Sequence, residues 1–448
     1  MRVDTQYASP ATPTVLHDGL GRGLTVKGRA LCAHGRKNRH PNPGGAYVTR
    51  VLVADKLHPT ALTGLQALPG VEVVSRPDLT AETLPGEISG FEVLVVRSTK
   101  VTAAVLAAGD ALGLVIRAGA GVNTIDVAEA SRRGVYVANC PGRNAAAVAE
   151  LTLALILAID RRIADNVNDL RQGRWNKKGF SKSRGLKGQT VGVIGTGSIG
   201  REVIARLRPF GVEIVAWSRS LTDAEADELG VRRAHDLIEL ARGADVVTVH
   251  VALAAETRDM LAGPFFEAMR PNATFINTSR AEVVNGGALR EALRQKGIFA
   301  GLDVFDDEPS TGEGAFDCDL KAFPNVYGTH HIGASTDEAE KATGEEVVRI
   351  VAALTAGSEI PNCVNLRSPG AARGGLVVRH EDRVGVLASV LAALKEHGYN
   401  VQEMQNQIFE GVSAAACARI MLGAEPSPKV VEVVGQCDGV VRVTRIGA

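Results

Sequence analysis

The chain has 448 residues, and its 50 Lys and Arg are balanced by 50 Asp and Glu. This neutral balance provides no overall field that would favour a nucleic acid as partner. No apolar stretch is long enough to span a membrane, so we expect a cytoplasmic protein of two or three domains. The six cysteines are scattered without a CxxC pair, which predicts neither a disulfide framework nor a bound metal.

Residues 1–49 differ in composition from the rest of the chain. They hold seven Lys and Arg against two Asp and Glu, with many Gly and Pro and no sustained apolar period. We expect this segment to be a disordered extension without a chemical role.

From residue 50 onwards, short β-branched runs alternate with helical segments. The first runs cover residues 51–54, 71–74, 93–97 and 115–118, and an apolar helix is expected over 144–160. Residues 190–327 then repeat strand–helix units. Such alternation predicts an α/β fold with a parallel, doubly wound sheet.

The same pattern predicts the domain boundaries. We expect a substrate-binding domain over 50–143 that is completed by a return helix within 328–362, and a cofactor-binding domain over 144–327. A linker over 363–375, rich in Pro, Gly and polar residues, would lead to a compact unit of four strands and two helices over 376–448.

A glycine-rich turn indicates a dinucleotide site. The apolar strand at 190–194 leads into Gly195-x-Gly197-x-x-Gly200 and then a helix. The three glycines would allow the tight turn, the approach of a pyrophosphate, and close packing of helix on strand. Ser198 and Ile199 lie in the same turn, at the helix N-terminus that would receive the anion.

The end of the next strand bears on the choice between NAD and NADP. An acid is expected about 20 residues after the turn, but the strand ends in Trp217, Ser218 and Arg219. A hydroxyl and a guanidinium would attract a 2′-phosphate rather than repel it. The alternative is that Arg219 only lies over the adenine while NAD binds through other contacts. We expect NAD or NADP, with some preference for NADP tolerance.

Three side chains near predicted strand ends suggest chemistry on a 2-oxo or 2-hydroxy acid. Arg280 follows the strand at 274–277, Glu308 follows the strand at 301–304, and His331 precedes the return helix. A His supported by a carboxylate can exchange a proton with the substrate oxygen near neutral pH. An Arg can bind the carboxylate and polarise the carbonyl.

These motifs, in this order, resemble those of the D-isomer-specific 2-hydroxyacid dehydrogenases. The resemblance covers about residues 51–360 and includes the segments that begin at Val193, Asn277, Asp303 and His331. It implies a Rossmann-type domain for NAD or NADP and a flavodoxin-like α/β substrate domain. It also implies Arg280 as the catalytic cation, Glu308 as partner of the histidine, and His331 as general acid and base. Further cofactor contacts are implied at Thr278, Ser279 and Asp303. His330 stands where the family usually has proline.

Within the family, several segments resemble the members that oxidise 3-phosphoglycerate. Arg97 and Ser98 match a phosphate-binding strand end, although a second arginine found there in some members is Thr99 here. The loop Gly119-Ala120-Gly121 matches one that holds the substrate carboxylate. Lys177 lies in a segment that resembles one that packs on a sister subunit, which implies a homodimer or homotetramer. In that arrangement Lys177 would contact the substrate phosphate of the neighbouring subunit. The alternative is that Arg97 and Lys177 are solvated surface charges.

Residues 376–448 resemble an ACT domain, which implies a regulatory α+β module of order βαββαβ. His380, Asp382 and Asn400 fall at positions that contact a serine effector in that family. Asp382 stands where that family commonly has asparagine, which leaves open whether the amino-acid effector is serine. The alternative is that the module only pairs subunits.

Two other functions remain open. A glyoxylate or hydroxypyruvate reductase would suit Ser218 and Arg219, whereas the ACT-like module and Lys177 count against it. A corepressor of this fold would keep the dinucleotide site and act by recruiting partners, but such proteins lack an ACT-like tail.

Overall fold

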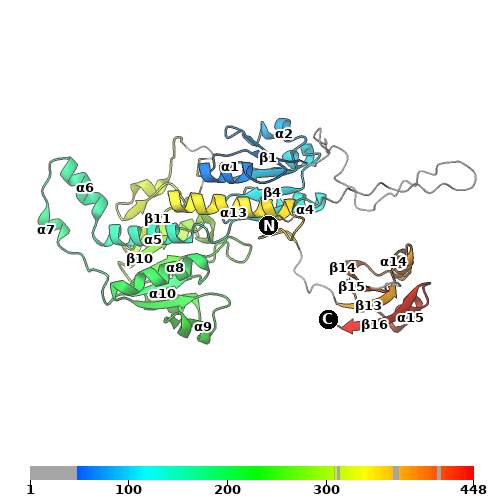
Figure 1. Cartoon of the computed structure of the whole chain (residues 1–448). Helices are drawn as coiled ribbons and strands as arrows, with labels where there is room; N and C mark the ends of the chain where they lie inside the picture. The colour runs from blue at the N-terminus through cyan, green and yellow to red at the C-terminus, as the bar shows by residue number, and fades with distance from the viewer. Residues whose placement is uncertain (1–47, 307, 310–312, 367–372, 411–414, 448) are drawn as a thin grey trace, which may run out of the picture. The chain divides into compact units, whose positions relative to one another are not determined.

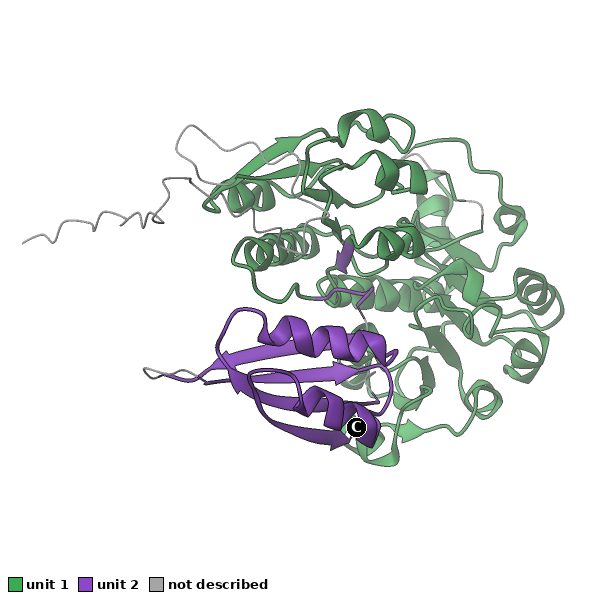
Figure 2. Cartoon of the chain, turned by 90° about the vertical axis from the view of Figure 1, so that its right-hand side faces the viewer, with its two compact units in different colours: residues 1–135, 139–361 green, residues 136–138, 362–448 purple. Residues whose placement is uncertain are grey.

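The computed structural model describes residues 48–306, 308–309, 313–366, 373–410 and 415–447. The predicted extension over 1–49 falls almost wholly outside these residues, as does part of the predicted linker. The chain divides into two compact units, residues 1–135 with 139–361 and residues 136–138 with 362–448 (Figure 2). The finer boundaries predicted within the first unit stay predictions.

The first parallel sheet has the strand order β2-β1-β3-β4-β5, the order typical of flavodoxin-like folds. Its strands are β1 (Thr49–Val53), β2 (Val71–Ser75), β3 (Val93–Val96), β4 (Leu114–Arg117) and β5 (Tyr136–Asn139). All residues of β3 are buried, as expected for a strand covered on both faces.

The helices of this part are α1 (Pro59–Gln66), α2 (Leu84–Glu87), α3 (Ala103–Ala108), α4 (Val127–Arg133) and the returning α13 (Asp337–Thr355). Helix α13 lies along α1 (Figure 1). A Cβ on Gly344 would lie 2.7 Å from the Ala61 side chain. The close approach of the two helices therefore depends on a residue without a side chain. This packing also brings the first turn of α13 to the carboxyl ends of the strands of this sheet.

The second parallel sheet has seven strands in the order β12-β11-β10-β9-β6-β7-β8. They are β6 (Thr190–Ile194), β7 (Glu213–Trp217), β8 (Arg232–Arg233), β9 (Val246–Val249), β10 (Thr274–Asn277), β11 (Phe299–Leu302) and β12 (Val326–Gly328). The order reverses between β6 and β9, and such switch points are where doubly wound folds bind ligands.

Helices cover both faces of this sheet. One hydrophobic cluster joins it to α5 (Ala145–Asp160) and α8 (Ser198–Leu207). Another joins it to α10 (Leu237–Gly243), α11 (Gly263–Ala268) and α12 (Gly286–Gln295). The short α9 (Asp223–Glu228) follows β7. The predicted α/β class and doubly wound sheet are confirmed.

Two short helices, α6 (Ile163–Arg171) and α7 (Lys177–Phe180), form an arm after α5. Leu170 is 59% exposed and Trp175 is 81% exposed, and neither helix has a buried residue. The arm contains the segment predicted to contact a sister subunit. Its exposed apolar side chains are consistent with that prediction, which stays untested.

The second unit has the predicted βαββαβ order. Its elements are β13 (Gly374–Glu381), α14 (Val386–Glu396), β14 (Val401–Ile408), β15 (Ala415–Leu422), α15 (Pro428–Gly435) and β16 (Val440–Gly447). The sheet is antiparallel in the order β14-β15-β13-β16, and a hydrophobic core joins it to both helices. Among the described residues, no helix combines the length and apolarity needed to span a membrane.

Candidate active site

The glycine turn has the geometry that a dinucleotide needs. Gly195 has φ +95°, and a Cβ there would lie 2.5 Å from the His250 carbonyl oxygen. A Cβ on Gly200 would collide with the Gly195 carbonyl oxygen, whereas one on Gly197 would meet nothing within 4 Å. The turn is therefore tight where helix meets strand and open at Gly197, where a pyrophosphate can approach the N-terminal N–H groups of α8.

The end of β7 lies beside this turn, because the Gly195 N–H donates to the Trp217 carbonyl oxygen at 2.7 Å. Ser218 and the exposed Arg219 follow directly. The residues present thus fit a bound nicotinamide dinucleotide, and they place a cation rather than a carboxylate next to the turn.

His331 and Glu308 form a hydrogen-bonded pair. The distance between His331 Nδ1 and Glu308 Oε2 is 2.6 Å, and Glu308 Oε1 accepts from the Phe305 N–H at 2.9 Å. Burial alone would raise the pKa of Glu308, but the hydrogen bonds from His331 and Phe305 and the charges of His331 and Arg280 lower it below its ordinary value. The carboxylate therefore stays ionised and can stabilise an imidazolium.

The pair lines a cavity of about 590 Å³ together with Phe305 and Phe316. His331 has φ +52°, which is uncommon for a residue with a side chain and clusters at functional sites. Because Nδ1 is engaged by Glu308, Nε2 is the ring nitrogen left to exchange a proton with a substrate.

Asp303 holds the loop that carries His331. Its carboxylate is buried and accepts from the Ile332 N–H at 2.9 Å, the Gly333 N–H at 2.8 Å and the Thr329 hydroxyl at 2.6 Å. The sequence analysis predicted Asp303 only as a contact of the cofactor, and that contact stays a prediction. Its role in positioning this loop was missed.

Arg280 follows β10 and reaches the loop after β4 of the other parallel sheet. Asn277 fixes the backbone after β10, since its side chain donates to the Arg280 carbonyl oxygen and accepts from the Ser279 N–H. A Cβ on Gly121 would lie 2.8 Å from Arg280 Nη2. The predicted carboxylate loop at 119–121 is therefore in contact with the predicted catalytic cation. Thr278, also a predicted cofactor contact, shares a hydrogen bond with Thr152 of α5.

An arginine cluster, formed by Arg97 and Arg117, lies at the carboxyl ends of the strands of the five-stranded sheet. Arg97 pairs with Glu340 of α13 through an Nη1–Oε1 contact of 2.8 Å, and the Arg97 carbonyl oxygen accepts from Arg117 Nε at 3.1 Å. Burial, together with the charges of Arg280 and Arg97, lowers the pKa of Arg117 to about 10. Arg117 is thus a buried cation beside two like charges, which an anion bound at this site would stabilise.

Sequence reasoning missed three of these residues. Arg117 ends β4 directly before the predicted glycine loop, and its position at a strand end was a usable signal. Asp55 accepts from the backbone N–H groups of Arg97, Ser98 and Thr99, so the Ser98 amide is already engaged. Neither Asp55 nor Glu340 belongs to a motif that would have marked it.

Lys177 begins α7 on the arm and lines a surface hollow with Trp175 and Leu170. Its predicted contact with the phosphate of a neighbouring subunit stays a prediction.

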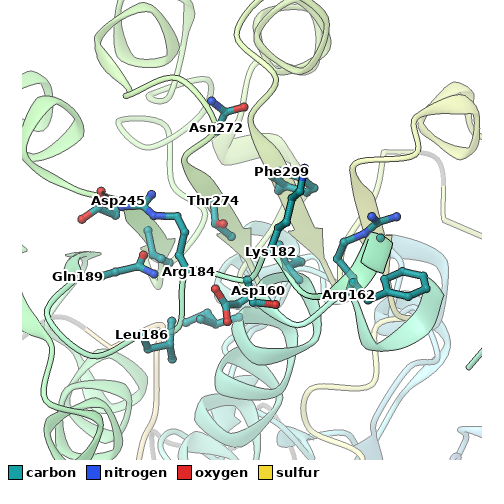
Figure 3. Close-up of a pocket in the computed structure, with 16 residues that line it drawn as sticks. Asp160, Arg162, Lys182, Arg184, Leu186, Gln189, Asp245, Asn272, Thr274 and Phe299 are labelled. Carbon is teal, nitrogen blue, oxygen red and sulfur yellow. Dashed lines mark hydrogen bonds and ion pairs between the residues drawn. The ribbon is translucent and has the colours of Figure 1, made fainter. Parts of the chain in front are cut away.

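A further cavity of about 280 Å³ lies at the opposite, amino-terminal ends of the strands of the seven-stranded sheet (Figure 3). Its charged side chains are largely engaged: Arg184 pairs with Asp245 at 3.0 Å, and Asp160 accepts from the Gly185 N–H at 3.1 Å. It contains none of the predicted site residues. The chemistry is therefore concentrated at the carboxyl ends of the strands.

The three predicted effector residues do not converge within one chain. His380 and Asp382 lie at the end of β13, where His380 is buried and its Nε2 contacts Asn406 Oδ1 at 3.2 Å. Asn400 precedes β14, and its carbonyl oxygen accepts from the Gly423 N–H. Gly423 follows Leu422, which pairs with Gly374 at the start of β13, so Asn400 lies near the opposite end of β13 from His380. The length of the strand, about 20 Å, separates the two positions.

Comparisons with known proteins agree with this fold. Residues 153–333 match the NAD binding domain of the D-isomer specific 2-hydroxyacid dehydrogenases. The chain is 39% identical over 321 residues to D-3-phosphoglycerate dehydrogenase of Methanocaldococcus jannaschii. The matched region covers 71% of this chain and 60% of that protein.

Two solved structures are also similar. The TT0316 protein of Thermus thermophilus has a TM-score of 0.63 at 32% identity, covering 70% of this chain and 100% of that one. D-Lactate dehydrogenase of Escherichia coli has a TM-score of 0.60 at 26% identity, covering 71% of this chain and 100% of that one.

The chain belongs to the D-isomer specific 2-hydroxyacid dehydrogenase family. Its seven-stranded half is an NAD(P)-binding domain. It spans 60% of the length of the first curated relatives that it matches, all of which are named D-3-phosphoglycerate dehydrogenase.

Proposed function

We propose that this chain is a D-3-phosphoglycerate dehydrogenase, which oxidises 3-phospho-D-glycerate to 3-phosphohydroxypyruvate with NAD or NADP, the first step of L-serine biosynthesis. The observation that carries the proposal is the position of Arg280. It contacts the glycine loop that follows Arg117, and its charge lowers the pKa of Glu308, the partner of His331. One substrate could therefore meet a proton acceptor at its hydroxyl and arginines at its two anionic groups.

In this proposal each residue of the site has its own role. Arg280 and the N–H groups of Ala120 and Gly121 hold the substrate carboxylate, since the Gly119 N–H donates to the Arg117 carbonyl oxygen at 2.8 Å. His331 Nε2 takes the hydroxyl proton as the substrate C–H bond breaks, and Glu308 stabilises the resulting imidazolium. The bound nicotinamide supplies the hydride acceptor. Arg97 and Arg117 hold the phosphate at the other end of the substrate.

An amino-acid effector of the C-terminal unit forms the regulatory part of the proposal, with serine as the first candidate. Strand β14 is an edge of its sheet. If two copies paired antiparallel along β14, the start of one strand would lie beside the end of the other. Asn400 of one copy would then approach His380 and Asp382 of the second, which fits a homodimer or homotetramer.

A glyoxylate or hydroxypyruvate reductase is the second candidate, because Ser218 and Arg219 offer no carboxylate to exclude NADPH. Steady-state rates with 3-phosphoglycerate, glyoxylate and 2-oxoglutarate, each with both cofactors, separate the candidates. The proposal expects the highest kcat/KM with 3-phosphoglycerate. Preference for glyoxylate would support the reductase, and no turnover with any substrate would favour a binding protein.

A further inference from the structure

Glu340 introduces a negative charge into the arginine cluster. It lies in the first turn of α13, where Thr336 caps the helix and acidic residues are favoured by the helix dipole. Its Oε1 is 2.8 Å from Arg97 Nη1, and the two side chains are 34% and 32% exposed. The contact joins residues 243 positions apart in the chain.

This pair lines the small cavity at the strand ends of the five-stranded sheet. The cavity of about 70 Å³ is also lined by Arg117, Gly119 and His58. The Arg117 side chain is turned against Gly119 and donates through Nε to the Arg97 carbonyl oxygen. Asp55 is nearby, but its Oδ2 accepts from three backbone N–H groups. Glu340 is therefore the carboxylate in direct contact with the guanidinium of Arg97.

We propose that Glu340 is a specificity-determining residue, which competes with the phosphate of the substrate for Arg97 and so sets how strongly the site prefers a phosphorylated 2-hydroxyacid. The inference rests on the proposed function. A dianionic phosphate at Arg97 must either share the guanidinium with a carboxylate or displace it, and like charges in a partly buried site repel. A substrate that ends in a neutral hydroxymethyl group meets no such repulsion.

A purely structural role for Glu340, tying α13 to the end of β3, makes a different prediction. Glu340→Gln keeps an oxygen that can accept from Arg97 and removes only the charge. If the contact matters only as a tie, this substitution affects all substrates alike. If the charge matters, the effect is confined to the phosphorylated substrate.

The experiment compares the full-length wild type with Glu340→Gln, using 3-phospho-D-glycerate and D-glycerate as substrates. These two compounds differ only in the phosphate. We expect KM for 3-phospho-D-glycerate to fall about fivefold, the size of a strong but partly exposed charge interaction, while KM for D-glycerate stays unchanged. Glu338→Gln is the matched control, since it removes the same charge from an exposed position in the same turn, and it should leave both KM values unchanged.

Equal changes for both substrates, a rise in KM for the phosphorylated one, or the same fall in Glu338→Gln would overturn the inference. Calorimetric titration of both compounds gives the same comparison without turnover. If the wild type oxidises neither compound, the proposed function fails. Tighter binding of 3-phospho-D-glycerate alone to Glu340→Gln would then still support the role of Glu340, and unchanged binding would refute it.

Discussion

The charged groups at the carboxyl ends of the strands are paired to different extents in the two parallel sheets. At the seven-stranded sheet, Glu308 and His331 are matched, and their hydrogen bond keeps the carboxylate ionised. At the five-stranded sheet, Glu340 pairs with Arg97, whereas burial and the like charges of Arg280 and Arg97 lower the pKa of Arg117. The first arrangement suits the transfer of a proton, and the second suits the binding of an anion.

This contrast separates two kinds of kinetic effect. Changes in the His331–Glu308 pair should reduce kcat, because the pair acts on the atoms that react. Changes in the arginine cluster should mainly raise KM for phosphorylated substrates, because the cluster holds a part of the substrate that does not react.

The largest effect is expected from His331→Ala. Loss of the proton acceptor should lower kcat by about two or more orders of magnitude. Cofactor affinity should hardly change, because His331 would act on the reacting oxygen of the substrate and not on the pyrophosphate. Stopped-flow or steady-state rates check the first point, and nicotinamide fluorescence checks the second. His235→Ala, which removes an exposed histidine of the same half of the chain, is the control. Near-normal turnover would remove His331 from the mechanism.

The second prediction concerns the cofactor. Ser218→Asp combined with Arg219→Ile replaces attraction for a 2′-phosphate by repulsion. Since a hydrogen bond to a charged group contributes about 1.5–3 kcal/mol, NADPH should lose roughly tenfold to a hundredfold more kcat/KM than NADH. Rates with both cofactors give the answer. If the wild type already rejects NADPH, or if the double variant loses activity with both cofactors equally, Arg219 is only a neighbour of the adenine.

The third prediction concerns Arg117. A cation whose pKa is lowered in the folded state costs folding free energy at neutral pH. Arg117→Met should therefore leave Tm equal or higher, while KM for 3-phosphoglycerate rises about tenfold through loss of one charge-assisted contact. Thermal melts and steady-state kinetics measure the two effects. A marked fall in Tm with unchanged KM would show that Arg117 is structural.

The smallest effect on catalysis is expected from removing residues 370–448. Arg280, Glu308 and His331 all precede this cut, so kcat should be unchanged. Any inhibition by serine or another amino acid should disappear, which rate measurements with added amino acids would show. Inhibition that survives the truncation would place the effector site elsewhere in the chain.

The sequence predicted the reacting side of the site better than the anion-binding side, and the reason is physical. Gly195, Glu308 and His331 each lie in a continuous motif at a strand end, and parallel strands bring their carboxyl ends to one edge. The contact between Arg97 and Glu340 depends instead on how α13 packs on α1, which no local pattern encodes. Asn400 shows a similar limit. Its distance from His380 follows from the antiparallel strand directions in the C-terminal sheet, and only the sheet order reveals it.

The most direct test of the whole account uses the two enantiomers of 3-phosphoglycerate. If Arg280 holds the carboxylate, His331 the hydroxyl and the arginine cluster the phosphate, three groups around C2 are fixed. Only one enantiomer can then direct its C–H bond at the nicotinamide. Initial rates of nicotinamide reduction by the wild type should therefore be measurable with the D isomer and absent with the L isomer. Similar rates with both isomers, or none with the D isomer, would contradict the claim that the two strand-end regions hold one substrate.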